Sequence, residues 1–222
     1  MSYVHALVDE QRDLAAELTK LIAGEVRFDS YTKAMYATDA SIYQMEPVGV
    51  VLPRSVEDVQ ATVETCFRYG IAVLPRGGGT SLAGQGVNHA VVIDFSKYLN
   101  NVLEVNEEEH WARVQPGIAL DTLSHHVSSL GLKYGPDPTT SSRATIGGAT
   151  GNNSCGPHSL IYGKTIDHVQ ELAVVLSDGS LARLGLLEGS ALGERMRTND
   201  LEGNIYREVL RLIDENRDEI SR

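Results

Sequence analysis

The feature that most constrains the fold of this sequence is a pair of glycine-rich segments. The first covers residues 75–86 and reads PRGGGTSLAGQG; the second covers residues 144–156 and reads ATIGGATGNNSCG. Glycine loses more backbone entropy on folding than any other residue, so such segments occur where the main chain bends sharply or approaches something closely. Both segments could instead be flexible turns. Their presence in one chain favours a ligand that both segments contact.

An oxyanion is the ligand that suits such segments best. Consecutive backbone N–H groups in tight loops form concave anion sites, and Thr80 and Ser81 add hydroxyl donors. A diphosphate is the common biological anion of this shape. Two familiar phosphate motifs are absent. Leu82 stands where the last glycine of G-x-G-x-x-G would fall, and His158 stands where an ATP-type loop ending at Thr165 would need its first glycine.

Composition narrows the class of protein. The chain has 222 residues and a formal net charge of −11, which argues against a nucleic-acid partner. It contains no run of about 18 apolar residues and therefore no predicted transmembrane helix. The first twenty residues read as an acidic amphipathic helix and lack the pattern of a secretion signal. Cys66 and Cys155 are the only cysteines and neither lies in a C-x-x-C pair, which predicts a reduced, cytoplasmic setting and no metal site.

The first half of the chain reads as a small α/β unit. A helix is expected over residues 4–22, followed by an irregular segment with a helical turn over 28–46. Buried strands are expected over 48–54, 71–75 and 89–96. Ser55 is a good N-cap, with acidic residues after it, for a helix that ends at Gly70.

The second half alternates short strands with long irregular stretches. The patterns predict a hairpin over residues 101–117, an amphipathic helix over 118–131, a strand–turn–strand unit over 167–184 and a helix over 204–222. Residues 133–165 show little regular pattern. Because long loops in compact domains are either functional or disordered, and this one carries buried-type side chains, we expect it to be ordered against a ligand.

Several motifs then occur in a characteristic order. They read VLPRSVEDV, GIAVLPRGGGTSLAGQ, ARVQPG, LGLKYGPDPTT, ATIGGATGNNSCG, YGKTIDHV and LAVVLSDGS. Together they resemble the FAD-binding domain of the vanillyl-alcohol oxidase (PCMH-type) flavoprotein family over about residues 35–185. Within that family the chain is similar to the glycolate oxidase, D-lactate dehydrogenase and D-2-hydroxyglutarate dehydrogenase branch. It is most similar to the N-terminal part of large proteins that add a C-terminal iron–sulfur domain.

The resemblance implies an α+β fold, with two α+β subdomains and FAD between them. On this basis we divide the chain into three parts. Residues 1–46 form an N-terminal helix and irregular segment, residues 47–99 a first α/β FAD-binding subdomain, and residues 100–222 a second, truncated α+β subdomain.

The resemblance also assigns cofactor contacts. The first glycine segment would hold the FAD diphosphate, mainly through backbone donors, and the PDPTT and ATIGG segments would wrap the cofactor from the other side. The residues so assigned are Pro75, Arg76, Gly77, Gly78, Gly79, Thr80, Ser81, Gln85, Gly86, Pro136, Asp137, Thr140, Thr145, Gly147, Gly148 and Asn152. Some relatives attach FAD through a histidine that ends an R-x-G-G-H motif. Thr80 occupies that position here, so we expect dissociable, non-covalent FAD. Arg76 could add charge, or it could form a structural salt bridge.

Catalytic residues are not assigned. Oxidation of a 2-hydroxy acid needs a base for the hydroxyl proton and a cation for the carboxylate. None of the histidines inspected stands in a pattern that marks a base; these are His125, His126, His158 and His168. Arg143 and Lys164 could face the substrate's carboxylate, although solvated surface is the favoured interpretation of both. In relatives, substrate contacts come from a following substrate or cap domain. The resemblance therefore implies that this C-terminal part is missing, and only such a segment could carry an iron–sulfur cluster.

We therefore expect the FAD-binding part of a flavin-dependent dehydrogenase or oxidase. Its substrate would be a 2-hydroxy acid of the lactate, glycolate or 2-hydroxyglutarate type, with hydride transfer to flavin N5 and onward transfer to an electron acceptor or carrier. Two alternatives stay open. One is a non-catalytic nucleotide-binding module, and the other is an NADPH-dependent flavin reductase of the cell-wall precursor type.

Overall fold

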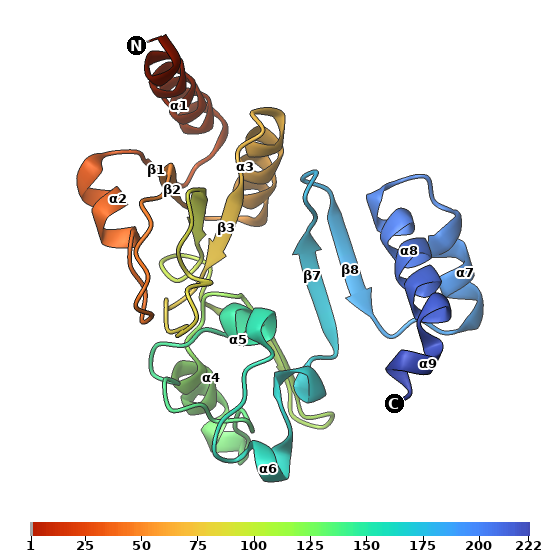
Figure 1. Cartoon of the computed structure of the whole chain (residues 1–222). Coiled ribbons are helices and arrows are strands. Elements are labelled where there is room, and N and C mark those ends of the chain that lie inside the picture. The colour runs from red at the N-terminus through yellow and green to blue at the C-terminus, as the bar shows by residue number, and fades with distance from the viewer. Residues whose placement is uncertain (1) are drawn as a thin grey trace. The chain divides into compact units, whose positions relative to one another are not determined.

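The structure is a computed structural model that describes the backbone of residues 2–222 and the side chains from residue 9 onward. The chain divides into two compact units, Met1–Val169 and Gln170–Arg222. Figure 1 shows the order of the elements along each unit.

The first unit is built on a four-stranded sheet with the order β1-β2-β4-β3. Its strands are β1 (Glu25–Arg27), β2 (Gly49–Leu52), β3 (Val73–Arg76) and β4 (Val91–Asp94). β4 lies parallel to both β2 and β3, while β1 pairs with β2 in antiparallel fashion. Every residue of β2 and β4 is buried, as expected for the central strands of a sheet covered on both faces.

Two helices pack together beside this sheet, α1 (Ser2–Leu21) and α3 (Val56–Arg68). Leu14 and Leu18 of α1 are fully buried in a cluster that also contains Val51 and Cys66. The Ser55 hydroxyl accepts a hydrogen bond from the Asp58 backbone N–H at 3.2 Å, which caps α3 as the sequence predicts. A short helix, α2 (Ser30–Tyr36), follows β1 and has Asp29 as its N-cap.

Glu25 begins β1 and anchors this edge of the sheet. Its carboxylate accepts hydrogen bonds from Lys97 Nζ, from Tyr98 Oη at 2.5 Å and from Arg27 Nη2 at 2.7 Å. These donors, led by Lys97, lower the pKa of Glu25 to about 2. The edge strand is therefore tied to the segment that follows β4.

The rest of the first unit begins with the hairpin of β5 (Val102–Asn106) and β6 (Trp111–Val114). Helix α4 (Leu120–Val127) and a 3-10 turn (Ser128–Leu130) follow, and Ile118, Leu123 and Val127 form a second core cluster. The remaining elements are α5 (Ile146–Asn152), α6 (Ser159–Tyr162) and a second 3-10 turn (Thr165–His168).

The second unit consists of a hairpin and three helices. Its elements are β7 (Glu171–Val175), β8 (Leu181–Gly185), α7 (Gly189–Arg197), α8 (Leu201–Glu215) and α9 (Arg217–Ile220). β7 and β8 pair in antiparallel fashion around the predicted Asp-Gly turn, where Gly179 takes a φ of 89°. None of the helices in the described part of the chain has the length and hydropathy to cross a membrane.

The mixed helix and strand content confirms the predicted α+β class. Three local predictions were wrong. β1 was missed, the stretch 133–165 contains two short helices, and the last long helix begins at Leu201 because Asp200 caps it. The proposed boundary between residues 99 and 100 stays a prediction. The division into compact units falls elsewhere, after residue 169.

Candidate functional site

The two glycine-rich segments meet in the first unit. A Cβ added to Gly77 would lie 2.0 Å from Thr145 Oγ1, and one added to Gly78 would lie 2.1 Å from the Arg143 carbonyl oxygen. No side chain fits at either distance, so glycine is required for this approach. The predicted convergence of the two segments is confirmed.

Side chains join the two segments at a second place, farther along each segment. Gln85 Nε2 donates to Asn152 Oδ1 at 3.3 Å, and Asn152 Nδ2 donates to Ser81 Oγ at 3.0 Å. Asn152 ends α5, whose N-cap is Thr145, so one short helix carries both points of contact. The two segments are thus in contact at two places, near Gly77 and at Asn152.

The first glycine segment contains a run of backbone N–H groups without a hydrogen-bond acceptor among the described residues. Within the described chain, no protein acceptor takes a hydrogen bond from the backbone N–H groups of residues 77–85. The next amide, that of Gly86, donates to Asp39 Oδ2 at 3.1 Å. Consecutive N–H groups without a protein acceptor suit an anion site, and the first two of this run, at Gly77 and Gly78, line a pocket.

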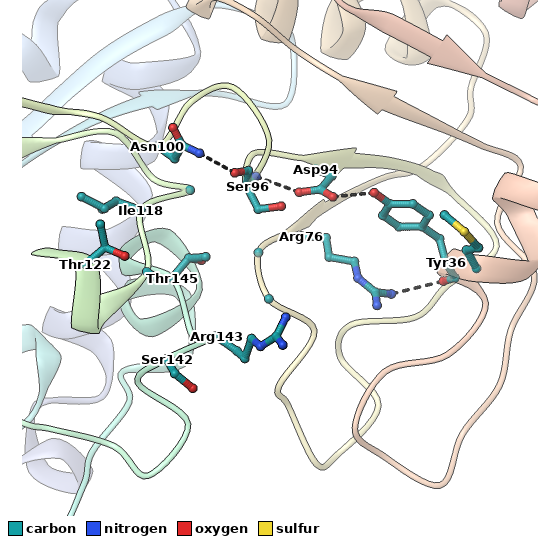
Figure 2. Close-up of a pocket in the computed structure, with 15 residues that line it drawn as sticks. Tyr36, Arg76, Asp94, Ser96, Asn100, Ile118, Thr122, Ser142, Arg143 and Thr145 are labelled. Atoms are coloured by element: carbon teal, nitrogen blue, oxygen red, sulfur yellow. Dashed lines mark hydrogen bonds between the residues drawn. The ribbon is translucent and has the colours of Figure 1, made fainter.

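A pocket of about 470 Å³ lies where the segments meet, between the end of β3 and the start of α5 (Figure 2). This volume is in the range of cofactor and ligand sites. The lining residues are Met35, Tyr36, Arg76, Gly77, Gly78, Asp94, Ser96, Asn100, Gly117, Ile118, Ala119, Thr122, Ser142, Arg143 and Thr145.

Arg76 holds the first glycine segment in place. Its guanidinium donates to the carbonyl oxygens of Tyr36 at 3.2 Å, Thr38 at 2.8 Å and Gly86 at 2.9 Å. The alternative of a structural role for Arg76 holds, but its partners are neutral carbonyl oxygens and not the carboxylate of a salt bridge. The side chain spans both ends of the loop and so fixes its curvature.

A hydrogen-bonded pair lines the pocket beside Arg76, whose guanidinium carbon lies 5.3 Å from the centre of the Tyr36 ring. Tyr36 Oη donates to Asp94 Oδ2 at 2.5 Å, and the Ser96 backbone N–H donates to Asp94 Oδ1 at 2.7 Å (Figure 2). Burial, together with the nearby carboxylate, raises the pKa of Tyr36. The phenol therefore stays protonated and satisfies Asp94, the one carboxylate among the lining residues.

The predicted cofactor residues divide into two groups. Arg76, Gly77, Gly78 and Thr145 line the pocket. The remaining twelve lie outside its lining, and they are Pro75, Gly79, Thr80, Ser81, Gln85, Gly86, Pro136, Asp137, Thr140, Gly147, Gly148 and Asn152. Most of these flank the meeting point along the same two segments, and their contact with a cofactor stays a prediction.

Sequence reasoning missed most of the lining. Asp94 ends the buried strand β4, and Ser96 and Asn100 follow it, so a polar residue at the end of a buried strand was the available signal. Arg143 was interpreted as surface although it directly precedes the second glycine segment. Tyr36 reaches the pocket from a helix that is distant in sequence, and no local pattern indicates this.

None of the histidines considered for catalysis lines the pocket. His158 Nδ1 lies 2.8 Å from Asp137 Oδ2, and His168 Nε2 lies 2.8 Å from the Tyr162 carbonyl oxygen. His125 and His126 are exposed on α4. The described residues also contain no cluster of three metal-ligating side chains. The unpaired amides and the two arginines of the lining suit an anionic ligand, and the described lining residues include no histidine.

Comparison with known proteins identifies the family to which this sequence is similar. The family model described as "FAD binding domain" matches residues 47–185. D-2-hydroxyglutarate dehydrogenase of Pantoea ananatis (strain AJ13355) is 38% identical over 186 residues, which cover 82% of this chain and 18% of that protein. Glycolate oxidase subunit GlcD of Bacillus subtilis (strain 168) is 35% identical over 179 residues, which cover 78% of this chain and 38% of that subunit. The chain thus spans about a fifth to two fifths of these relatives' length.

Solved structures give the same answer for the fold. An alkyldihydroxyacetonephosphate synthase superposes with a TM-score of 0.71 at 25% identity, over 80% of this chain and 35% of that one. A 4-ethylphenol oxidase from Gulosibacter chungangensis superposes with a TM-score of 0.65 at 27% identity, over 79% and 35%. The PCMH-type architecture is therefore confirmed. Two converging glycine segments, free amides above a pocket and the family match together show that this chain belongs to the FAD binding domain family.

Proposed function

We propose that the chain binds FAD non-covalently, with the cofactor's diphosphate against the backbone N–H groups of residues 77–85. The observation that carries this proposal is that these amides have no acceptor within the described protein, and that the first two of them, at Gly77 and Gly78, line the pocket. Thr80, which stands where some relatives carry an attachment histidine, supports dissociable binding. The other predicted contacts, such as Asp137 and Gly148, belong to the same proposal.

The reaction proposed for the whole protein is oxidation of a 2-hydroxy acid. The relatives named above are a D-2-hydroxyglutarate dehydrogenase and a glycolate oxidase subunit, and a third is a D-lactate dehydrogenase [cytochrome] of Kluyveromyces lactis at 28% identity. When bound, the flavin would supply a hydride acceptor at N5 for the carbon that bears the hydroxyl.

The chain's own residues would bind and orient rather than react. The glycine segments would hold the diphosphate. Arg76 joins the two ends of the first segment through the Gly86 carbonyl oxygen and ties it to the carbonyl oxygens of Tyr36 and Thr38. The Tyr36–Asp94 pair keeps a carboxylate in the pocket wall hydrogen-bonded, which limits its repulsion of an anionic cofactor. The base, the substrate carboxylate site and the electron acceptor or carrier would belong to further parts of a longer, cytoplasmic protein. An iron–sulfur cluster, if present, would lie there too.

Thermal unfolding with and without FAD tests the binding proposal. A ligand that binds only the native state must raise the unfolding temperature as its concentration rises. Gly78→Asp should abolish this rise, because it places a carboxylate against the Arg143 carbonyl and beside the phosphates. An FAD-induced rise in Gly78→Asp as large as in the parent would refute the proposed site.

Anaerobic mixing of the FAD-loaded protein, in its longest available form, tests the reaction. We expect D-2-hydroxyglutarate, D-lactate or glycolate to bleach the absorbance of oxidised flavin. Bleaching by NADPH and not by any hydroxy acid would favour the reductase alternative. No bleaching by any of them would favour the non-catalytic alternative.

A further inference from the structure

Arg143 extends from the second glycine segment towards the first (Figure 2). Its backbone carbonyl is the atom that a Cβ on Gly78 would strike, so its main chain lies directly against Gly78 of the first segment. Arg143 is exposed and lines the pocket, so an entering ligand can reach its side chain.

The guanidinium of Arg143 is uncommitted. Within the part of the chain that the structure describes, no hydrogen bond, ion pair or ring contact of this side chain is found. Asp94, the carboxylate among the lining residues, is already bonded by Tyr36 and Ser96. The other cation of the pocket, Arg76, is committed to three carbonyl oxygens. Arg143 is therefore the positive group that the pocket leaves available to a ligand.

Because the chain is acidic overall, a cation beside the bound phosphates would favour binding. A formal net charge of −11 repels a diphosphate at long range, and backbone amides are neutral donors. A cation close to the phosphates offsets this repulsion, and a guanidinium can make paired hydrogen bonds to phosphate oxygens.

We propose that Arg143 binds the diphosphate of the dinucleotide and supplies the local positive charge of the site. This inference rests on the proposed function, because it takes FAD as the ligand. It differs from the sequence-based interpretation, in which Arg143 is solvated surface. It also differs from a role in binding the substrate's carboxylate.

Titration of the chain with FAD and with ADP, at several salt concentrations, tests this assignment. We compare the parent with Arg143→Gln and Arg143→Lys. Arg12→Gln is the matched control, since it removes the same charge from an exposed position on α1 that does not line the pocket. Melting without ligand reports whether each variant is folded.

We expect Arg143→Gln to weaken both FAD and ADP about tenfold, as loss of one charge-assisted contact does, and to flatten the salt dependence of the dissociation constant. Arg143→Lys should recover part of the affinity, and Arg12→Gln should match the parent. Unliganded melting should not change, because no hydrogen bond or ion pair joins this side chain to the described residues.

Two results would overturn the inference while leaving the proposed function intact. One is parent-like affinity and salt dependence in Arg143→Gln, which would place the diphosphate elsewhere or reserve Arg143 for the substrate's carboxylate. The other is weaker binding with an unchanged salt dependence, which would indicate a structural effect. Failure of the parent itself to bind FAD would instead overturn the proposed function, and this inference with it.

Discussion

Replacing Gly78 by alanine should force the two glycine segments apart. The added Cβ would lie 2.1 Å from the Arg143 carbonyl oxygen, and real Cβ contacts are essentially never below 3.0 Å. The segments must therefore separate by about 0.9 Å, the difference between these two distances. The obstacle is backbone, so no side-chain rotation can relieve it.

Overpacking of this kind costs about 1–3 kcal/mol in proteins. For a chain of this length each kcal/mol lowers the unfolding temperature by about 2–4 °C. The φ of Gly78 lies outside the left-handed region, so the whole effect comes from the contact. Separating the segments also moves the free amides, and we expect weaker FAD binding in addition to the lower stability.

Gly151→Ala is the matched control, in the second glycine segment. Gly151 lies inside α5 with no atom within 4 Å of an added Cβ, and alanine favours a helix by about 1 kcal/mol over glycine. Calorimetry should therefore show Gly78→Ala melting below the parent and Gly151→Ala at or above it. Equal melting temperatures for the parent and Gly78→Ala would refute the close approach of the segments.

Other predictions address single groups. Tyr36→Phe leaves Asp94 with one donor fewer, so urea unfolding should show a loss of about 1 kcal/mol and FAD binding should weaken. The folded-state pKa of Glu25 is about 2, below its ordinary 4.5, so its contribution is complete above pH 4.5 and lost as pH falls towards 2. Because its charged partners are about half exposed, Glu25→Gln should cost only about 1 kcal/mol at pH 6, and the difference from the parent should disappear as pH falls through 2. Burial raises the pKa of Cys66 to about 12 while Cys155 is exposed, so a thiol reagent should label only Cys155 until the protein unfolds. Labelling of Cys66 in the native protein would contradict its burial.

The sequence was sufficient to predict the elements with strong local signals. Ser55 and the acidic residues after it mark the start of α3, and the Asp-Gly turn marks the hairpin of β7 and β8. The convergence of the glycine segments was also predictable, since so many glycines are costly without a close approach.

The missed features depend on contacts distant in sequence. β1 is three residues long, carries two charges, and is a strand because it pairs with β2 and is anchored by Lys97. α5 contains three glycines, so its pattern reads as loop, and it becomes a helix against Pro116, which accepts from the Gly147 amide at 2.8 Å. The bonds of Arg76 to carbonyl oxygens required the loop to be folded before they could be recognised.

The central claim is that the free amides of the first glycine segment hold the cofactor's diphosphate. Nuclear magnetic resonance of the amide-labelled chain, titrated with FAD and then with ADP, measures this directly. The account predicts that both ligands shift the amide resonances of residues 77–85 most strongly, with a smaller group of shifts around Arg143. Binding of FAD that leaves the amides of Gly77, Gly78 and Gly79 unmoved would contradict it.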